Sequence, residues 1–559
     1  MTTPPADTPA TAAAAGAAAS DQDQLPGGPG ETPAYLSHRQ ILIVLCGVMA
    51  GMLLFALDQG IVGTALPRIV SELGGLNQLS WVVTAYLLTS TASTPLWGKI
   101  SDLYGRRLIF QVAIVIFLIG SALSGLSQNM VQLIGFRALQ GVGGGGLFAI
   151  ALAIIGDVIP PRERGRYQGY FGAVFGVSSI AGPLLGGWFT DGPGWRWIFY
   201  VNLPIGLAAL VVTSLVLKMP VVRREHSIDY LGAVTVVAAV TSLLLYLDWR
   251  GRDYGWGEPW ALALLGLAIA LSGLFILIER RAAEPILPLR LFRNPVFSVG
   301  NIYAFLAGVA MFGVIIFLPL YLQGVKGFSP TKSGLALIPA IIGIFSTSIT
   351  SGQLITRRGK YKPYPIIGAV VLIISLLALS RLEVGTPYWL AAIYMYLFGA
   401  GLGFTMQTIV TAVQNAVEFR DLGAATSAVT FFRQMGGSIG AAVFGAVLTT
   451  RLAHYLTEAF AALGPAAGAA ASSAGADANN IQSIQTLPEP VKGLVLTAFT
   501  KALDDVFLIG VPFIVVALIV ALFLKEVPLR TGPGPGGPPA ASGDGDEVPA
   551  GAPAQTFGH

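Results

Sequence analysis

Residues 41–66 read ILIVLCGVMAGMLLFALDQGIVGTAL, an almost wholly apolar stretch with a single carboxylate, Asp58, inside it. A helix of this length is about 39 Å long, which exceeds the roughly 30 Å of a bilayer's hydrocarbon core. An ionised Asp inside such a helix costs roughly 2.5–3.5 kcal/mol. The stretch therefore predicts a membrane-spanning helix with a proton or cation site at Asp58. The alternative interpretation is that Asp58 lies near the outer mouth, where water reaches it.

The rest of the chain repeats this apolar character. Of the 559 residues, 54% are hydrophobic and only 11% are charged, whereas soluble domains carry about 25% charged residues. The composition therefore predicts an all-α membrane protein, located in the plasma membrane and crossing it many times. With residues 41–66, the apolar runs predict fourteen spans, the other thirteen being 79–97, 108–126, 131–156, 167–189, 197–217, 230–247, 260–278, 297–321, 333–355, 364–380, 389–413, 422–449 and 504–524.

The distribution of basic residues predicts the orientation of the spans in the membrane. An even number of spans puts both termini on one side, and most of the 33 Lys and Arg residues lie in the segments on that side. Because positive charge is enriched on the cytoplasmic side, we expect cytoplasmic N and C termini. The tails 1–38 and 527–559 are rich in Ala, Gly and Pro and are predicted to be disordered.

A degenerate repeat divides the spans into halves. Gly141, Gly143 and Gly145 recur 258 residues later as glycines, and Gly98 and Gly105 recur 254 residues later. We predict two pseudo-symmetric six-helix bundles with two helices inserted between them, with bounds 39–220, 221–290 and 291–526. Paired halves around a central site are typical of transporters.

The repeat keeps the glycines and loses the charges. Asp58 aligns with Ala310, and Arg137 aligns with Met395. The coupling chemistry is therefore expected in the N-terminal half.

Four motifs resemble those of the major facilitator superfamily, and within it the 14-spanner drug:proton antiporter group, which contains multidrug efflux transporters. They are GKISDLYGRR at 98–107, RALQGVG at 137–143, GPLLGG at 182–187 and LDQGIVGTALP at 57–67. The last departs from the group, in which Thr is common at Gly60 and Asn at Gly63. The resemblance covers about residues 38–450 and 504–526.

The resemblance implies roles for several residues. Asp58 and Arg137 become candidates for proton coupling, although Arg137 is alternatively a structural residue bonded to backbone carbonyls. Gly98, Asp102, Gly105, Arg106 and Arg107 become candidates for a cytoplasmic gate, whose charges are alternatively ordinary positive-inside residues.

Two further sets of residues are singled out. Gly182, Pro183, Gly186 and Gly187 are candidates for a hinge in the fifth span, or simply for close helix packing. Arg433 is the only Lys or Arg within a span of the second half, and it is a candidate, with Gln140, for gating or substrate contact, against a structural role.

Other classes of function find little support. Residues 141–146 fit the dinucleotide pattern GxGxxG but follow no strand, so they indicate helix packing. No GxxxxGK[ST] loop is present, which argues against an ATP-driven pump. The single Cys46 forms no disulfide within the chain, and the four His residues are predicted in loops or tails. We predict no cofactor, no metal and no nucleic-acid partner.

The segment 450–503 is predicted to be a long extracytoplasmic loop with an Ala- and Gly-rich middle. Its flanks, 449–462 and 490–501, are predicted as amphipathic helices on the membrane surface. Guidance of lipophilic substrates and a neutral insertion are the two interpretations.

The sequence as a whole predicts a proton-coupled antiporter that acts as a monomer by alternating access. It would export lipophilic drugs or antibiotics, cationic ones among them, and it would not be an enzyme. The alternatives are a dedicated exporter of one natural product or lipid, a proton-coupled importer, and a membrane-bound enzyme or sensor.

Overall fold

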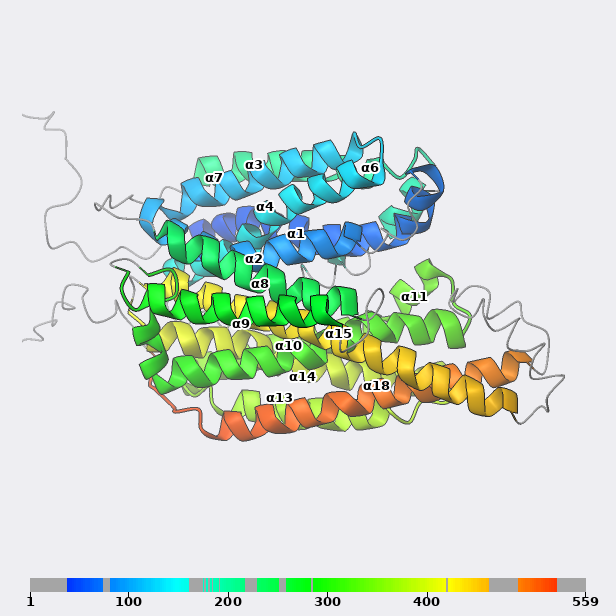
Figure 1. The fold of residues 1–559 in the computed structure, drawn as a ribbon. Helices are drawn as coiled ribbons and strands as arrows, with labels where there is room; N and C mark the ends of the chain where they lie inside the picture. The colour runs from blue at the N-terminus through cyan, green and yellow to red at the C-terminus, as the bar shows by residue number, and fades with distance from the viewer. Residues whose placement is uncertain are drawn as a thin grey trace, which may run out of the picture.

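The computed structural model describes residues 38–73, 81–159, 174, 177–178, 181–182, 184–190, 192–216, 229–250, 258–282, 285–418, 421–461 and 491–529. Within these residues every regular element is a helix. The helices form two bundles, drawn one above the other in Figure 1 with their axes running across the picture. The predicted all-α class is confirmed for this part of the chain.

The N-terminal bundle contains the helices drawn in blue to blue-green in Figure 1. They are α1 (His38–Leu73), α2 (Trp81–Tyr104), α3 (Arg106–Gly125), α4 (Met130–Val158), α6 (Trp197–Tyr200) and α7 (Asn202–Val216). Residues 184–190, from the fifth predicted span, are also helical. Gly105 joins α2 to α3 with a φ of 94°, a left-handed conformation that glycine adopts without strain.

Two antiparallel helices, α8 (Tyr230–Arg250) and α9 (Pro259–Glu279), separate the bundles in the chain. The C-terminal bundle follows. Its elements are η2 (Leu289–Arg293), α10 (Pro295–Leu320), η3 (Tyr321–Val325), α11 (Pro330–Ala336), α12 (Ile338–Arg358), α13 (Pro363–Leu379), α14 (Tyr388–Ala416), α15 (Leu422–Ala461) and α18 (Val491–Leu522).

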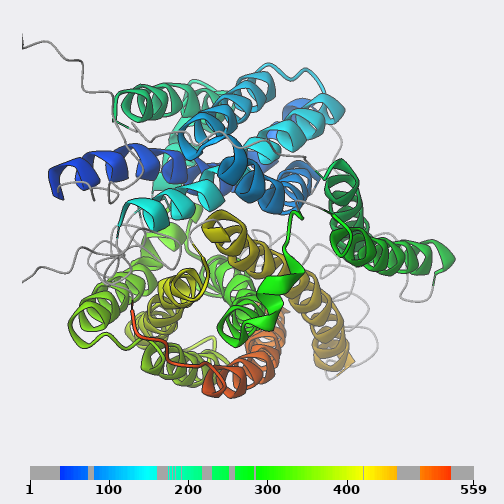
Figure 2. The same cartoon turned by 90° about the vertical axis from the view of Figure 1, so that its left-hand side faces the viewer.

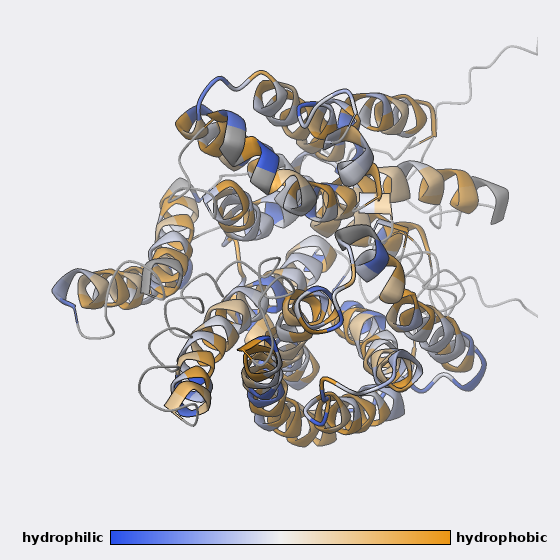
Figure 3. Cartoon of the chain, turned by 90° about the vertical axis from the view of Figure 1, so that its right-hand side faces the viewer, coloured by the Kyte–Doolittle hydropathy of each residue, from blue (hydrophilic) through white to orange (hydrophobic). Residues whose placement is uncertain are grey.

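These helices suit a bilayer by length and composition. Ten of the described helical segments are long and apolar enough to cross a membrane, and α8 and α13 contain shorter apolar helices. Many large apolar side chains point outward, such as Trp260, Ile269 and Leu522, and orange or pale ribbon dominates Figure 3. A lipid environment accounts for this exposed apolar surface. The count of fourteen spans stays a prediction.

Two expectations about the region after residue 449 are corrected. The predicted surface helices at 449–462 and 490–501 are instead continuous with the long helices α15 and α18, as far as Ala461 and from Val491. The hydroxyl of Tyr455, in the extension of α15, donates to Asp505 of α18 at 2.9 Å. His454 was predicted in a loop and lies in α15, because α15 runs past the apolar part of its sequence.

The repeated glycines make equivalent contacts in the two halves. A Cβ on Gly141 or Gly145 would overlap backbone of α2, and one on Gly399 or Gly403 would overlap backbone of α12. Between them, Gly143 packs against α3 as Gly401 packs against α13. Each central helix, α4 or α14, is thus held closely between two neighbours.

Hydrogen bonds across these helix pairs also repeat. Ser93 donates to the carbonyl of Val142 at 3.2 Å, and Thr347, 254 residues later, donates to the carbonyl of Ala400 at 2.8 Å. Ala400 lies 258 residues after Val142, so donor and acceptor follow the offsets read from the sequence.

The α8–α9 hairpin packs where the two bundles meet. One apolar cluster contains Leu88 of α2, Val240 of α8, Phe275 of α9 and Phe431 of α15. The two bundles otherwise have separate cores. Seen from the end in Figure 2, the green hairpin lies to one side of both bundles. Most of α9 is exposed, which suits a helix that faces lipid.

Candidate functional site

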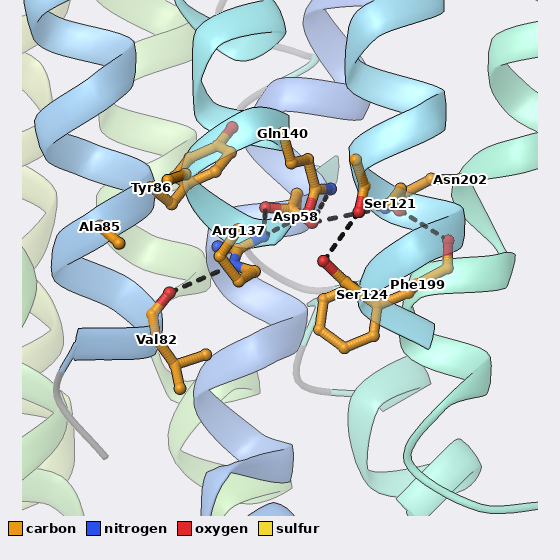
Figure 4. A network of polar contacts seen from close by, with 12 residues as sticks. Asp58, Val82, Ala85, Tyr86, Ser121, Ser124, Arg137, Gln140, Phe199 and Asn202 are labelled. Carbon is orange, nitrogen blue, oxygen red and sulfur yellow. Dashed lines mark hydrogen bonds and ion pairs between the residues drawn. The ribbon is translucent and has the colours of Figure 1, made fainter. Parts of the chain in front are cut away.

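Asp58 of α1 lies at the centre of a polar network inside the N-terminal bundle. The side chain is fully buried, so the interpretation that water reaches it at an outer mouth does not apply in this conformation. One carboxylate oxygen is 2.5 Å from Nη1 of Arg137 on α4. The other accepts from the amide of Gln140 at 2.8 Å. Figure 4 shows these side chains converging from two helices.

Arg137 has several partners and is 1% exposed. Besides Asp58, its guanidinium donates to the side-chain oxygen of Gln140 at 2.8 Å and to the carbonyl of Val82 at 3.2 Å. Its central carbon lies 4.2 Å from the ring centroid of Tyr86 on α2. A buried cation is tolerated when its donors are paired in this way. Arg137 therefore bonds both the carboxylate and a backbone carbonyl.

Sequence reasoning missed two members of the network. The amide of Asn202, the first residue of α7, donates to Asp58 at 3.4 Å and to Ser121 at 3.0 Å. Tyr86 is fully buried, and its hydroxyl has no hydrogen-bond partner among the described residues. An isolated Asn at the start of an apolar run was the available signal for Asn202. Nothing in the sequence distinguishes Tyr86 from a packing residue.

Glycines hold this network in place. A Cβ on Gly144 would lie 2.7 Å from the hydroxyl of Tyr86, and one on Gly120 of α3 would lie 2.5 Å from the backbone of Gln140. Helix α4 can therefore approach α2 and α3 closely enough for Arg137 and Gln140 to reach Asp58. The GxGxxG stretch serves helix packing here.

A second polar cluster joins the two bundles at the end where α2 turns into α3. Asp102 forms an ion pair with Arg106, and it accepts from the backbone N–H of Ala424 on α15 at 3.0 Å. Arg106 also donates to Asp157 of α4 at 2.7 Å and to the hydroxyl of Ser101 at 2.6 Å. Asp102 thus links the N-terminal bundle to the first turn of a C-terminal helix.

The electrostatics of Asp102 reflect its burial. It lies beyond the predicted span 79–97. Burial raises the pKa of Asp102 to about 6, although the nearby Arg106 lowers it; Asp157 raises it further. The first turn of α15 carries partial positive charge, which favours the ionised carboxylate. Asp102 is thus ionised at neutral pH and close to titration.

The other predicted gate residues differ in position. A Cβ on Gly98 would lie 2.5 Å from Cβ of Ser427, so Gly98 permits the contact between α2 and α15. Gly105 forms the turn. Arg107 lies outside the cluster, because it is half-buried and donates to the carbonyl of Ser214 on α7 at 2.7 Å.

The fifth predicted span is described in part. A Cβ on Gly182 would lie 3.0 Å from the backbone of Gly60 on α1, within the same bundle. Gly186 is buried and its carbonyl accepts from Thr190, whereas Gly187 is half-buried. Pro183 lies outside the described residues. The described contacts therefore establish close packing with α1.

Arg433 of α15 lies where the two bundles face each other. Its side chain is 6% exposed, and its central carbon is 5.2 Å from the ring centroid of Phe148 on α4. The next residue, Gln434, accepts from Thr94 of α2 at 3.3 Å. Gln140, which was grouped with Arg433 from the sequence, instead bridges Asp58 and Arg137.

The sequence and the fold are similar to those of known proteins. A model of the Major Facilitator Superfamily matches residues 48–441. The multidrug transporter protein MdtP of Bacillus subtilis (strain 168) is 39% identical over 515 residues, covering 88% of this chain and 94% of that protein. Multidrug resistance protein 3 of the same strain is 35% identical over 494 residues, covering 87% and 96%. A double Trp mutant of XylE has a similar solved structure, with a TM-score of 0.57 at 14% identity, covering 89% of this chain and 98% of that one.

Proposed function

This chain belongs to the major facilitator superfamily, and from that premise we propose that it exports small lipophilic molecules across the plasma membrane in exchange for protons. It is a multi-pass membrane protein of a family of transporters, and we propose no catalytic activity. Relatives named as multidrug transporters and efflux pumps support the direction of transport. Proton coupling and antiport are the proposed steps.

The observation that carries the proposal is the buried Asp58–Arg137 pair. With Asp58 ionised, the pair is neutral and its donors are bonded to acceptors. A proton on Asp58 removes one charge and leaves the guanidinium with Gln140 and Val82 as acceptors. Each protonation state then favours a different arrangement of α1 and α4, and a proton gradient biases the equilibrium between conformations.

The Asp102 cluster supplies the second part of alternating access. We propose that it closes the cytoplasmic end in this conformation and opens when the two bundles rock apart. The proposal includes five further features of the transporter. They are cytoplasmic termini, fourteen spans, boundaries at 220/221 and 290/291, an extracytoplasmic 450–503 segment and a functional monomer. Gly182, which packs on α1, would transmit the motion together with Pro183, Gly186 and Gly187.

The test uses proteoliposomes with a pH-sensitive dye trapped inside. A pH gradient is imposed, and lipophilic cations, weak acids and neutral antibiotics are added singly to wild type, Asp58→Asn and Glu458→Gln. Glu458 is an exposed carboxylate in the extension of α15, so it controls for loss of an acid outside the site. We expect proton movement triggered by substrate in wild type and Glu458→Gln, and none in Asp58→Asn.

Other outcomes lead to other conclusions. Proton movement that persists in Asp58→Asn would move coupling away from this pair. Movement with one natural product or lipid alone would favour the dedicated exporter. Accumulation rather than efflux in a drug-sensitive host would favour the importer, and turnover in detergent without a gradient would favour an enzyme.

A further inference from the structure

We propose that Arg433 is the anion-binding residue of the substrate site, and that this transporter prefers planar aromatic weak acids to cations. The inference rests on the proposed exporter function for the choice of ligand. It begins from a contrast among the buried arginines. Within the described residues these are Arg106, Arg137 and Arg433. The first two form ion pairs with Asp102, Asp157 and Asp58.

Arg433 has no hydrogen bond or ion pair with any described residue, although it is 6% exposed. The fifth predicted span, described only in part, adds no counter-ion, because residues 167–189 contain no Asp or Glu. A guanidinium has five N–H donors, and those of Arg433 have no partner among the described residues, although the residue is mostly buried. A ligand that reaches this guanidinium can supply the missing acceptor.

Aromatic rings supply the apolar part of the site. Phe148 lies beside the Arg433 guanidinium and stacks on Phe55 of α1, with ring centroids 5.9 Å apart and planes at 27°. Phe55 in turn lies 6.2 Å from Tyr86, over which Arg137 sits. A column of three rings therefore runs from the proton-coupling pair to Arg433 in the other bundle. Figure 4 shows the Tyr86 and Arg137 end of this column.

The charges at this place decide the sign of the ligand. Asp58 and Arg137 neutralise each other, so Arg433 leaves one net positive charge among these residues. A cation would be repelled at short range, whereas a carboxylate or phenolate would accept from the free donors. A flat aromatic body matches rings that already stack on one another. The ligand class is therefore an aromatic weak acid, which differs from the cationic compounds expected among the substrates from the sequence.

Binding of three naphthalene probes in detergent tests the inference without a gradient. The probes are 2-naphthoate, the neutral 2-naphthamide and the cation 2-naphthylmethylammonium. They share one ring system and differ in charge, and titration calorimetry measures their Kd values. The proteins are wild type, Arg433→Gln, Arg433→Lys and Arg451→Gln. Arg451 lies on the same helix, is half exposed and pairs with Asp505, so it is the matched control.

We expect wild type and Arg451→Gln to bind naphthoate at least about tenfold more tightly than naphthamide. Arg433→Gln should weaken naphthoate binding about tenfold to a hundredfold and leave naphthamide binding unchanged. Arg433→Lys keeps the positive charge but loses the paired donors of the guanidinium. Its affinity for naphthoate should therefore lie between those of wild type and Arg433→Gln. If Arg433→Gln does not fold, the same comparison with Arg433→Lys decides.

Equal affinity for naphthoate and naphthamide in wild type would overturn the inference. The inference would also be overturned if the Arg433 variants lost affinity for naphthoate and naphthamide equally, or if they lost no affinity for naphthoate. Different results would refute the exporter proposal. Charge-dependent binding without coupled proton movement would refute antiport alone, and proton movement with unaltered naphthoate binding in Arg433→Gln would refute the role of Arg433 alone.

Discussion

Asp58 and Arg137 are each buried where an unpaired charge is expensive, and each is tolerated because of the other. Removing one partner of a buried pair typically costs 3–5 kcal/mol, roughly, because the remaining charge has no counter-ion. Arg137 keeps two neutral acceptors when Asp58 is lost, and Asp58 keeps two amide donors when Arg137 is lost. The neutral partners therefore limit the damage that either single substitution does.

A double-mutant cycle tests this coupling at the residue scale. We expect Asp58→Asn and Arg137→Gln each to destabilise the protein by about 2–4 kcal/mol, and the double variant to lose less than the sum by about 2 kcal/mol or more. Reversible chemical unfolding in micelles measures the losses. The exposed pair Glu72–Arg196, at 3.2 Å, is the control and should show coupling below about 1 kcal/mol. Additive losses at Asp58 and Arg137 would contradict the prediction.

The sequence identified the two charges of this network and singled out Gln140 for another role, but it missed Asn202 and Tyr86. Charges stand out in an apolar helix because their burial is costly. Asn202 and Tyr86 occur in apolar runs without such a cost, and their part in the network depends on how α2, α4 and α7 pack. That packing brings residues 144 positions apart within hydrogen-bonding distance. No local pattern carries such information.

At the scale of elements, the glycines of α4 set the helix spacing on which the network depends. Gly141 faces the backbone of α2 at Tyr86, whereas Gly135, six residues earlier on the same helix, has open space around it. We expect Gly141→Ala to destabilise the protein by about 1–3 kcal/mol, because the new methyl forces α2 and α4 apart.

Gly135→Ala is the matched control for that substitution. It adds the same methyl to the same helix without a steric clash, and it should be neutral or stabilising by up to about 1 kcal/mol. Thermal unfolding of the purified variants measures both effects. Equal effects of the two substitutions would show that the close approach of α2 and α4 does not limit stability.

The α8–α9 hairpin is held by one side of each helix. Phe275 is 8% exposed and packs in the cluster shared with α2 and α15, whereas its neighbour Leu274 is 45% exposed. Lipid replaces apolar contacts without a hydrophobic penalty, so the cost of Phe275→Ala is mainly lost packing. We expect a loss of about 1–3 kcal/mol for Phe275→Ala and less than about 0.5 kcal/mol for Leu274→Ala, measured by thermal unfolding. Equal losses of stability in the two variants would show that the cluster around Phe275 does not hold the hairpin.

At the scale of the molecule, the sequence predicted the helical class and the repeat, since both are local or periodic patterns. The offsets of 258 and 254 found among the glycines reappear as matched contacts around α4 and α14. The place of the α8–α9 hairpin was beyond such reasoning, because it depends on one apolar cluster built from four helices. The continuation of α15 and α18 past their apolar parts was missed for a related reason. Contacts between the two helices, such as that of Tyr455 with Asp505, depend on tertiary structure and not on a local pattern.

Asp102 is one of the described polar groups that connect the two bundles, and its charge changes with pH near neutrality. Three elements face it: α3 through Arg106, α4 through Asp157 and α15 through the N–H of Ala424. Burial in the closed contact raises the pKa of Asp102 to about 6, and an exposed Asp titrates near 3.9, roughly. The closed state therefore binds a proton more tightly than a state in which Asp102 faces water.

The sign of the pH dependence follows from linkage. Because the closed state has the higher pKa, its advantage from this group is fully present below about pH 4 and is lost as the pH rises through about 6. Spin labels at the C-terminal end of α2 and the N-terminal end of α15, in a variant without Cys46, would report the closed fraction by their separation. We expect that fraction to increase between about pH 7 and about pH 4, and Asp102→Asn to abolish the dependence. A closed fraction that falls on acidification, or a dependence that persists in Asp102→Asn, would show that another group controls this contact.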